Sequence, residues 1–284
     1  MVVFVYILLC LIWGSTWIAI KLGLSDAPPL YAAGIRFSLA VLILWSIMYF
    51  RKLRPPSTLR ELASRAYPGV FMYGTSYALV YLSEQYISSA LTAVLFGAFP
   101  FFVALLSKWK FRNVPISKIG WLGLMLGFAG VVLISWDSLK QSHAIFGGVL
   151  MTLTATFASA YGLMIHKRDH AHKEIVTSAA VQMTAGALIL LLAAIAFEDF
   201  SNFAFTPQSI GSILYLTFMG TITAFLGYYW LLGKVKVLTA SLIPFVTPMV
   251  AIFIGFGFFG ETLTTQTMIG AGMILSGITL VLRK

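Results

Sequence analysis

The chain has 284 residues, of which 60% are hydrophobic and only 10% are charged, and this balance excludes an ordinary water-soluble globular protein. The 19 Lys and Arg residues outnumber the 9 Asp and Glu residues and give a net charge of +10, an excess that indicates either membrane topology or nucleic-acid binding. The single cysteine, Cys10, excludes a disulfide framework and a cysteine-based metal site.

The N-terminal segment MVVFVYILLCLIWGSTWIAIK begins without a basic region, and its apolar run continues for about 20 residues before Lys21. It is therefore expected to be a retained membrane-spanning helix and not a cleaved signal peptide. Further apolar runs long enough to cross a membrane complete the series 2–22, 30–50, 66–83, 89–107, 118–136, 145–166, 175–197, 209–232, 238–259 and 265–282. The sequence predicts an all-α membrane protein of ten transmembrane helices, with connections too short for a soluble domain.

The cations lie mostly in alternate connections. Sixteen of the 19 Lys and Arg residues fall in 51–65, 108–118, 167–175, the connection after the eighth helix and the C-terminus. Short cytoplasmic loops carry such an excess, so these connections and both termini are predicted to be cytoplasmic, in a multi-pass protein of the plasma (inner) membrane. Because the alternation is a topology signal, no binding to nucleic acid is expected; membrane lipid is the expected surrounding.

Aromatic and hydroxyl side chains recur inside the predicted helices. A Tyr or Trp ring offers a flat apolar face with one hydrogen-bonding tip, which suits an amino acid with an apolar or aromatic side chain. The predicted substrate-binding residues are, in chain order, Trp13, Thr16, Trp17, Arg36, Tyr77, Tyr81, Tyr161, Tyr228 and Thr247. Aromatic residues also form belts at the membrane surface, so some of these side chains could lie there instead.

Arg36 is the cation placed inside a predicted helix, about six residues or roughly 9 Å from the helix start. Ionisable groups at such depth are functional by default. Two interpretations stay open: Arg36 holds a substrate carboxylate, or it pairs with Asp26, Glu84 or Glu261 as a structural strut. The matching position in the second half of the chain is Gln182, so a symmetric charge relay is not expected.

Short segments match between the two halves of the chain. They are LTAVLFGAFP (91–100) with LTASLIPFVTP (238–248), YGTSYA (73–78) with MGTITA (219–224), and IGWLGLMLG (119–127) with IGAGMILSG (269–277). The partners are five predicted helices apart, an odd number, so the second half enters the membrane from the opposite side. The sequence predicts two inverted five-helix repeats, residues 1–140 and 141–284.

Prolines occur at matching places in the fourth and ninth predicted helices. Pro100, Pro244 and Pro248 each remove a backbone donor and free a carbonyl. Broken helices at corresponding positions of inverted halves point to the central binding site of a transporter, which assigns these prolines to helix breaking and gating. The alternative is that they only kink the helices for packing.

Small residues line the fifth and tenth predicted helices at spacings that allow close contact. They are Gly120, Gly123, Gly127 and Gly130 on one, and Gly270, Gly272, Ser276 and Gly277 on the other. Packing within one chain is favoured over dimerisation, and the protein is expected to function as a monomer.

All nine carboxylates fall in connections or at helix ends, so no buried acid for proton coupling is expected, which favours a facilitator or an exchanger. The segment HKRDHAH carries His166, Asp169, His170 and His172, residue types that ligate metals. Its basic residues would repel a cation, so a solvated loop is expected. No metal site and no cofactor are predicted.

The segments WGSTW, YAAGIRFSLA and FFGETLTTQTMIGAGMILSGITLVL, in this order and spacing, resemble the EamA family of the drug/metabolite transporter superfamily over essentially the whole chain. The resemblance implies ten helices in two inverted repeats, alternating access, and export of amino acids or related small metabolites. In one departure, the first repeat has FRNVPISKIG where the second has FFGETLTTQTMIG, so Glu261 has no acidic counterpart.

The predicted function is a secondary transporter that exports or facilitates a small-molecule substrate. A lipid or isoprenoid-phosphate flippase of the same architecture is the first alternative, although it would need several deep cations to hold phosphate. A membrane-embedded enzyme is disfavoured because the chain contains no GxSxG and no HExxH motif. It also has no GxxxxGK[ST] loop for ATP.

Overall fold

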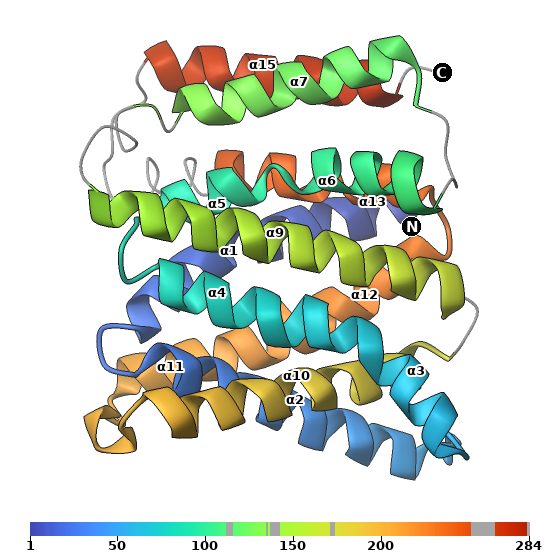
Figure 1. Ribbon diagram of the computed structural model, residues 1–284, viewed down its shortest axis with the longest axis vertical. Coiled ribbons are helices and arrows are strands. Elements are labelled where there is room, and N and C mark those ends of the chain that lie inside the picture. The colour runs from blue at the N-terminus through green and yellow to red at the C-terminus, as the bar shows by residue number, and fades with distance from the viewer. Residues whose placement is uncertain (112–115, 135, 137–142, 171–173, 251–264, 283–284) are drawn as a thin grey trace.

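The computed structural model describes residues 1–111, 116–134, 136, 143–170, 174–250 and 265–282, and these form a bundle of packed helices without strands (Figure 1). The helices are α1 (Val2–Gly23), α2 (Pro29–Phe50), α3 (Leu59–Gly69), η1 (Val70–Thr75), α4 (Ser76–Ser83), α5 (Ser89–Phe96), α6 (Phe99–Leu106), η2 (Ser107–Phe111), α7 (Lys118–Ile134), α9 (His143–Asp169), α10 (Ile175–Phe197), η3 (Phe200–Asn202), α11 (Pro207–Tyr215), η4 (Leu216–Thr223), α12 (Ala224–Leu232), α13 (Val237–Ala240) and α15 (Thr265–Leu282), and residues 243–250 are also helical.

The all-helical class is confirmed, and described residues are helical within each of the ten predicted ranges. Six helical segments in the described part of the chain are long and apolar enough to cross a membrane. They are Val2–Gly23, Pro29–Phe50, Leu91–Trp109, Phe146–Asp169, Ile175–Phe197 and Pro207–Leu232. Three shorter apolar helical segments accompany them, Lys118–Gly130, Val237–Val250 and Met268–Val281.

The chain runs back and forth between two ends of the bundle. The connection between α1 and α2 lies at the left of Figure 1, as does the connection between α10 and α11, whereas α2 meets α3 at the right. We call these the α1–α2 end and the α2–α3 end. Connections 51–58 and 198–206 therefore lie at opposite ends of the bundle.

Helices α7 and α15 lie side by side as an outer layer at the top of Figure 1. Their glycines let the two backbones approach closely: a Cβ added to Gly123 would lie 2.6 Å from the Gly277 carbonyl oxygen, and one added to Gly130 would lie 2.5 Å from that of Gly270. The predicted packing within one chain is thus seen at these positions. Gly272, in contrast, faces open space.

The two proline-containing stretches are interrupted helices. After α5, the turn at 97–98 precedes α6, where Pro100 occupies the first turn, as favoured for proline. After α13, a turn at 241–242 precedes the helical residues 243–250. Because Pro248 has no N–H, the Pro244 carbonyl loses its usual partner, and the Thr247 hydroxyl donates to it at 3.1 Å instead.

Two π-helical segments, η1 and η4, occupy matching places in the halves of the chain. They contain the segments VFMYGT and LTFMGTIT, whose Gly-Thr pairs are Gly74–Thr75 and Gly220–Thr221. A π-helix widens the turn and leaves carbonyls without regular partners, and such segments are frequent at functional sites. The Thr221 hydroxyl accordingly donates to the Leu216 carbonyl at 2.9 Å.

The prediction of a solvated loop at HKRDHAH is wrong for the residues that the structure describes. His166 and His170 are buried at the α2–α3 end, since α9 continues to Asp169. Pro68 inside α3 frees the Ser64 carbonyl, and His170 Nε2 donates to that oxygen at 3.0 Å. No metal-ligand cluster occurs among the described residues; His172 lies outside them.

Candidate functional site

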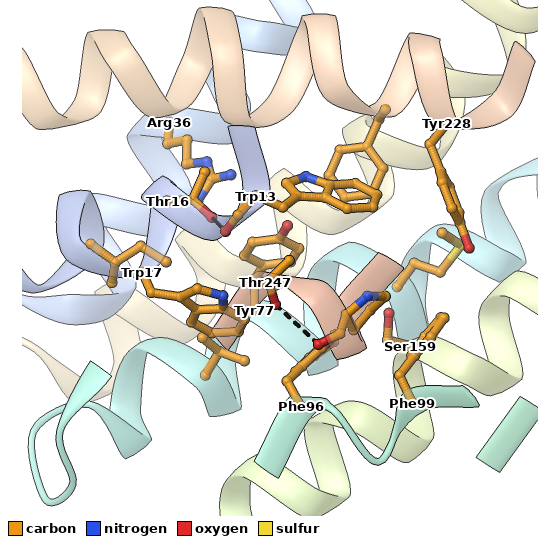
Figure 2. A pocket seen from close by; sticks show the side chains of 16 residues that line it. Trp13, Thr16, Trp17, Arg36, Tyr77, Phe96, Phe99, Ser159, Tyr228 and Thr247 are labelled. Carbon is orange, nitrogen blue, oxygen red and sulfur yellow. Dashed lines mark hydrogen bonds between the residues drawn. The ribbon is translucent and has the colours of Figure 1, made fainter. Parts of the chain in front are cut away.

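A cavity of about 70 Å³ lies between the two halves of the chain (Figure 2). Its walls come from α1, α2, η1, α4, α5, α6, α9, α12 and the helical residues 243–250. The break between α5 and α6 contributes Phe96 and Phe99, one on each side of the turn, which explains why the interrupted helix matters for the shape of the cavity.

Most of the predicted binding residues line this cavity. They are Trp13, Thr16, Trp17, Arg36, Tyr77, Tyr228 and Thr247, together with the predicted helix-breaking residue Pro244. The predicted residues that do not line it are Tyr81, Tyr161, Pro100 and Pro248. Tyr81 is one step removed, because its hydroxyl holds Arg36.

The cavity also has walls that the sequence analysis did not assign. These residues are Ile20, Met72, Ser76, Val80, Phe96, Phe99, Ser159 and Phe225. Helical spacing could have indicated Ser76 and Val80. They lie four residues apart on one face of the helix, beside the predicted residue Tyr77. Phe225 packs against Trp13 with ring centroids 5.3 Å apart, a long-range contact without a local sequence signal.

Arg36 is 1% exposed and is held by neutral groups. Its Nε donates to the Thr221 hydroxyl at 2.8 Å, and its Nη1 donates to the Tyr81 hydroxyl at 3.1 Å. The guanidinium carbon lies 5.0 Å from the ring centroid of Tyr77 and 5.3 Å from that of Phe37, within the range of cation–π attraction. The Gly-Thr pair of η4 makes this possible, since a Cβ on Gly220 would lie 3.2 Å from Arg36 Nη2.

No acidic side chain in the described part of the chain forms an ion pair with Arg36. Asp26 accepts a hydrogen bond from the Thr206 hydroxyl, and the carboxyl oxygens of Glu84 have no hydrogen-bond partner among the described residues. Glu261, the third proposed partner, lies outside the described residues. The strut interpretation is therefore wrong for Asp26 and Glu84, and the positive charge of Arg36 borders the cavity uncompensated by either.

Three further polar groups of the cavity wall are buried without a hydrogen-bond partner among the described protein atoms. They are Trp17 Nε1, Ser76 Oγ and the Tyr228 hydroxyl. Buried polar groups are nearly always satisfied by protein, water or ligand. The cavity thus offers one cation and three free hydrogen-bonding groups inside an aromatic wall.

Tyr161 lies in a different place from Tyr77. It borders a crevice near the α2–α3 end together with Ser64, Tyr67 and Arg168, and its ring contacts Phe71 with centroids 5.0 Å apart. The structure therefore separates two tyrosines that the sequence analysis had grouped.

Replacing Tyr77 by alanine is expected to lower transport about 2- to 30-fold, because the loss of a cation–π neighbour of Arg36 costs about 0.5–2 kcal/mol. Tyr161→Ala removes the same ring from outside the cavity and is the matched control, with near-normal transport expected. Initial rates in liposomes, normalised to the amount of protein, measure both. Equal losses in the two variants would contradict the placement of the site.

A second buried polar cluster surrounds Gln182, which the sequence comparison of the two halves pairs with Arg36. Gln182 Nε2 donates to His166 Nδ1 at 2.9 Å and its carbonyl accepts from the Tyr229 hydroxyl, which also meets the Tyr73 hydroxyl at 2.8 Å. The His166 ring stacks on Tyr229 with centroids 4.0 Å apart. These contacts join α9, α10, α12 and η1. They are hydrogen bonds between amide, imidazole and hydroxyl groups, and no carboxylate, Lys or Arg takes part in them.

The family model of the EamA-like transporter family matches the chain twice, over residues 1–136 and 146–283. The chain belongs to the EamA-like transporter family. As a family member it is a membrane transporter, which agrees with its apolar helices and central cavity. The family assignment made from the sequence motifs is confirmed.

Named relatives extend this EamA-like assignment along the full length. The uncharacterized transporter YoaV of Bacillus subtilis (strain 168) is 27% identical over 278 residues, covering 94% of this chain and 92% of that protein. The uncharacterized inner membrane transporter YedA of Escherichia coli (strain K12) is 27% identical over 276 residues, covering 96% of this chain and 88% of YedA. A crystal structure matches the fold with a TM-score of 0.79 at 14% identity, covering 99% of this chain and 96% of the other.

Proposed function

We propose that this EamA-like protein is a secondary transporter for small carboxylate-bearing metabolites, most of all amino acids with apolar or aromatic side chains. The observation that carries the proposal is Arg36, a buried cation without an acidic partner among the described residues, set in the wall of an aromatic cavity. A carboxylate is the group that a guanidinium fork binds best, and the aromatic wall suits an apolar or aromatic side chain.

The free hydrogen-bonding groups support a polar head group beside Arg36. The Tyr228 and Ser76 hydroxyls can accept from an ammonium group, and Trp17 Nε1 can donate to a carboxylate oxygen. An amino acid presents both groups on one carbon. The cavity of about 70 Å³ is smaller than typical ligand pockets of about 300–1,000 Å³, so binding requires the helices around it to separate. Such separation at one end at a time is alternating access.

The proposed architecture is ten transmembrane helices in two inverted repeats, residues 1–140 and 141–284. Its support is the double match of the family model, the paired π-segments η1 and η4, and the interrupted helices at 97–98 and 241–242. The distribution of cations supports an inner-membrane location with both termini in the cytoplasm and the α2–α3 end facing it. The proposed working unit is a monomer, since the cavity is built from one chain.

Counterflow in liposomes tests the substrate class. Vesicles containing the purified protein and unlabelled phenylalanine are diluted into trace labelled phenylalanine, leucine or lysine. Phenylalanine and leucine are expected to accumulate transiently, whereas lysine is excluded because its side-chain ammonium would enter an aromatic wall beside Arg36. No accumulation of any of the three would overturn the proposal.

Two other outcomes would assign a different function. Scrambling of a fluorescent phospholipid by the same vesicles, without counterflow, would indicate a flippase. Conversion of a substrate by the protein in detergent, without any vesicle, would indicate an enzyme.

A further inference from the structure

Glu84 is a buried carboxyl group without a hydrogen-bond partner among the described residues. It directly follows α4, at the α1–α2 end of the bundle, and its side chain is 0% exposed. Neither carboxyl oxygen has a hydrogen-bond partner in the part of the chain that the structure describes. Its position at a helix end led to the prediction that the chain has no buried acid, and that prediction is wrong because neighbouring helices cover Glu84.

Other acids at helix ends behave differently. Glu198 accepts from the backbone N–H groups of Leu30 and Tyr31 at 2.9 and 3.0 Å, and Glu174 accepts from that of Thr177 at 2.6 Å. These carboxylates cap helix N-termini, where negative charge is favourable. Glu84 lies instead at a helix C-terminus, where the backbone carbonyls disfavour negative charge.

The groups that face Glu84 are few. From α1, Lys21 Nζ donates to the backbone carbonyl of Glu84 at 2.9 Å. From α4, the helix that Glu84 follows, Tyr81 interacts electrostatically with Glu84 and its hydroxyl accepts a hydrogen bond from Arg36 of α2. The neighbouring part of α9 offers the Thr152 hydroxyl, which donates to Ser83 at 3.0 Å. This helix begins at the same end with the titratable residue His143, whose side chain lies outside the described ones, and its Lys, Arg and Asp residues lie at the opposite end. The side chains of α5 carry no charge.

An ionised carboxylate sealed in this way loses hydration that no hydrogen bond replaces, so the neutral acid is the stable form. Burial raises the pKa of the Glu84 carboxyl well above its usual range, and the ammonium of Lys21 offsets this in smaller part. A group that is protonated when sealed and ionised when wetted can carry one proton per cycle.

We propose that Glu84 is a proton-binding site that couples transport to proton movement, and this inference rests on the transporter function proposed above. In the described arrangement the site is closed and the carboxyl holds its proton. When the α1–α2 end opens, water reaches the carboxyl, the O–H bond breaks and the proton passes to water. The carboxylate then pairs with Lys21, whose ammonium already donates a hydrogen bond to the backbone carbonyl of Glu84.

Reprotonation closes the cycle. After the α1–α2 end has closed over the Glu84–Lys21 ion pair, a proton from the opposite side binds the carboxylate, and Lys21 returns to the backbone carbonyl. Only an O–H bond forms and breaks, so no further reactant is needed. A closed site with neither a proton on Glu84 nor its ion pair with Lys21 would bury an uncompensated charge, which links closure to the state of this carboxyl group.

Infrared spectroscopy of the purified protein tests the proton site without any substrate. The stretching band of a protonated carboxyl group is expected to persist near neutral pH, where an exposed glutamate with a pKa of about 4.3 is ionised. Glu84→Gln is expected to remove this band. Asp199→Asn is the matched control: exposed Asp199 accepts from the Ser201 N–H at 2.9 Å, which holds its pKa below the usual range, so the band stays. A band that survives in Glu84→Gln, or that is absent from the unaltered protein, would overturn the proposal.

Transport in liposomes tests the coupling. In the unaltered protein a pH gradient is expected to drive accumulation of labelled phenylalanine. In Glu84→Gln the pH gradient is expected to cause no accumulation, while counterflow without a gradient continues. Glu84→Asp keeps a titratable group and is expected to keep the drive with a shifted pH profile. Full gradient-driven accumulation in Glu84→Gln would refute the coupling. Absence of counterflow in every variant would refute the substrate proposal instead, and the infrared result would still decide whether Glu84 binds a proton.

Discussion

Replacing Arg36 by methionine is expected to weaken binding of carboxylate-bearing substrates about 10- to 100-fold, and transport with it. Hydrogen bonds to charged groups contribute about 1.5–3 kcal/mol each, and each 1.4 kcal/mol is about tenfold in affinity. Methionine fills a similar volume without a charge. Quenching of tryptophan fluorescence measures binding, because Trp13 and Trp17 line the same cavity.

The stability of the same variant separates a binding role from a structural one. Among the described residues Arg36 has no acidic partner, and a buried charge without one costs free energy. Arg36→Met is therefore expected to unfold at an unchanged or higher temperature in detergent. If Arg36 were a structural strut, the Arg36→Met variant would unfold at a lower temperature. Arg36→Lys keeps the charge but loses the planar fork that reaches Thr221 and Tyr81 together, so intermediate binding is expected. Unchanged binding in Arg36→Met would remove Arg36 from the site.

Replacing Gly277 by alanine is expected to destabilise the protein by about 1–3 kcal/mol, the usual cost of overpacking. A Cβ at this position would lie 2.5 Å from the Gly123 carbonyl oxygen and 2.7 Å from the Gly127 nitrogen, both backbone atoms that cannot turn away. The pair α7 and α15 would have to move apart. Thermal unfolding and the fraction of monodisperse protein in detergent measure the effect.

Gly272 provides the matched control in the same helix. A Cβ there meets nothing within 4 Å, so Gly272→Ala is expected to stabilise the protein by about 0.4–1 kcal/mol through the reduced entropy of the unfolded chain. A similar loss of stability in both variants would contradict the assignment to the contact with α7, because alanine by itself is the better helix former.

The cavity also explains why one face of the site was predictable and another was not. Trp13, Thr16 and Trp17 lie on successive turns of α1, and the motif that contains them is continuous in the sequence. Phe96 and Phe99 reach the cavity only because the helix breaks between them, and Ser159 reaches it from α9 by long-range packing. Tyr161, on the same helix, lies in another crevice.

The sequence by itself determined the membrane class, the positions of the helices and the interruptions near Pro100 and Pro244, because apolar run length, proline chemistry and glycine spacing are local properties of the chain. It also indicated the EamA-like family and half of the residues that line the cavity. Only the tertiary structure decided the partners of Arg36, the burial of Glu84 and the separation of Tyr161 from Tyr77. Whether a polar group at a helix end is solvated or sealed depends on which distant helices pack over it, and local sequence carries no information about that packing.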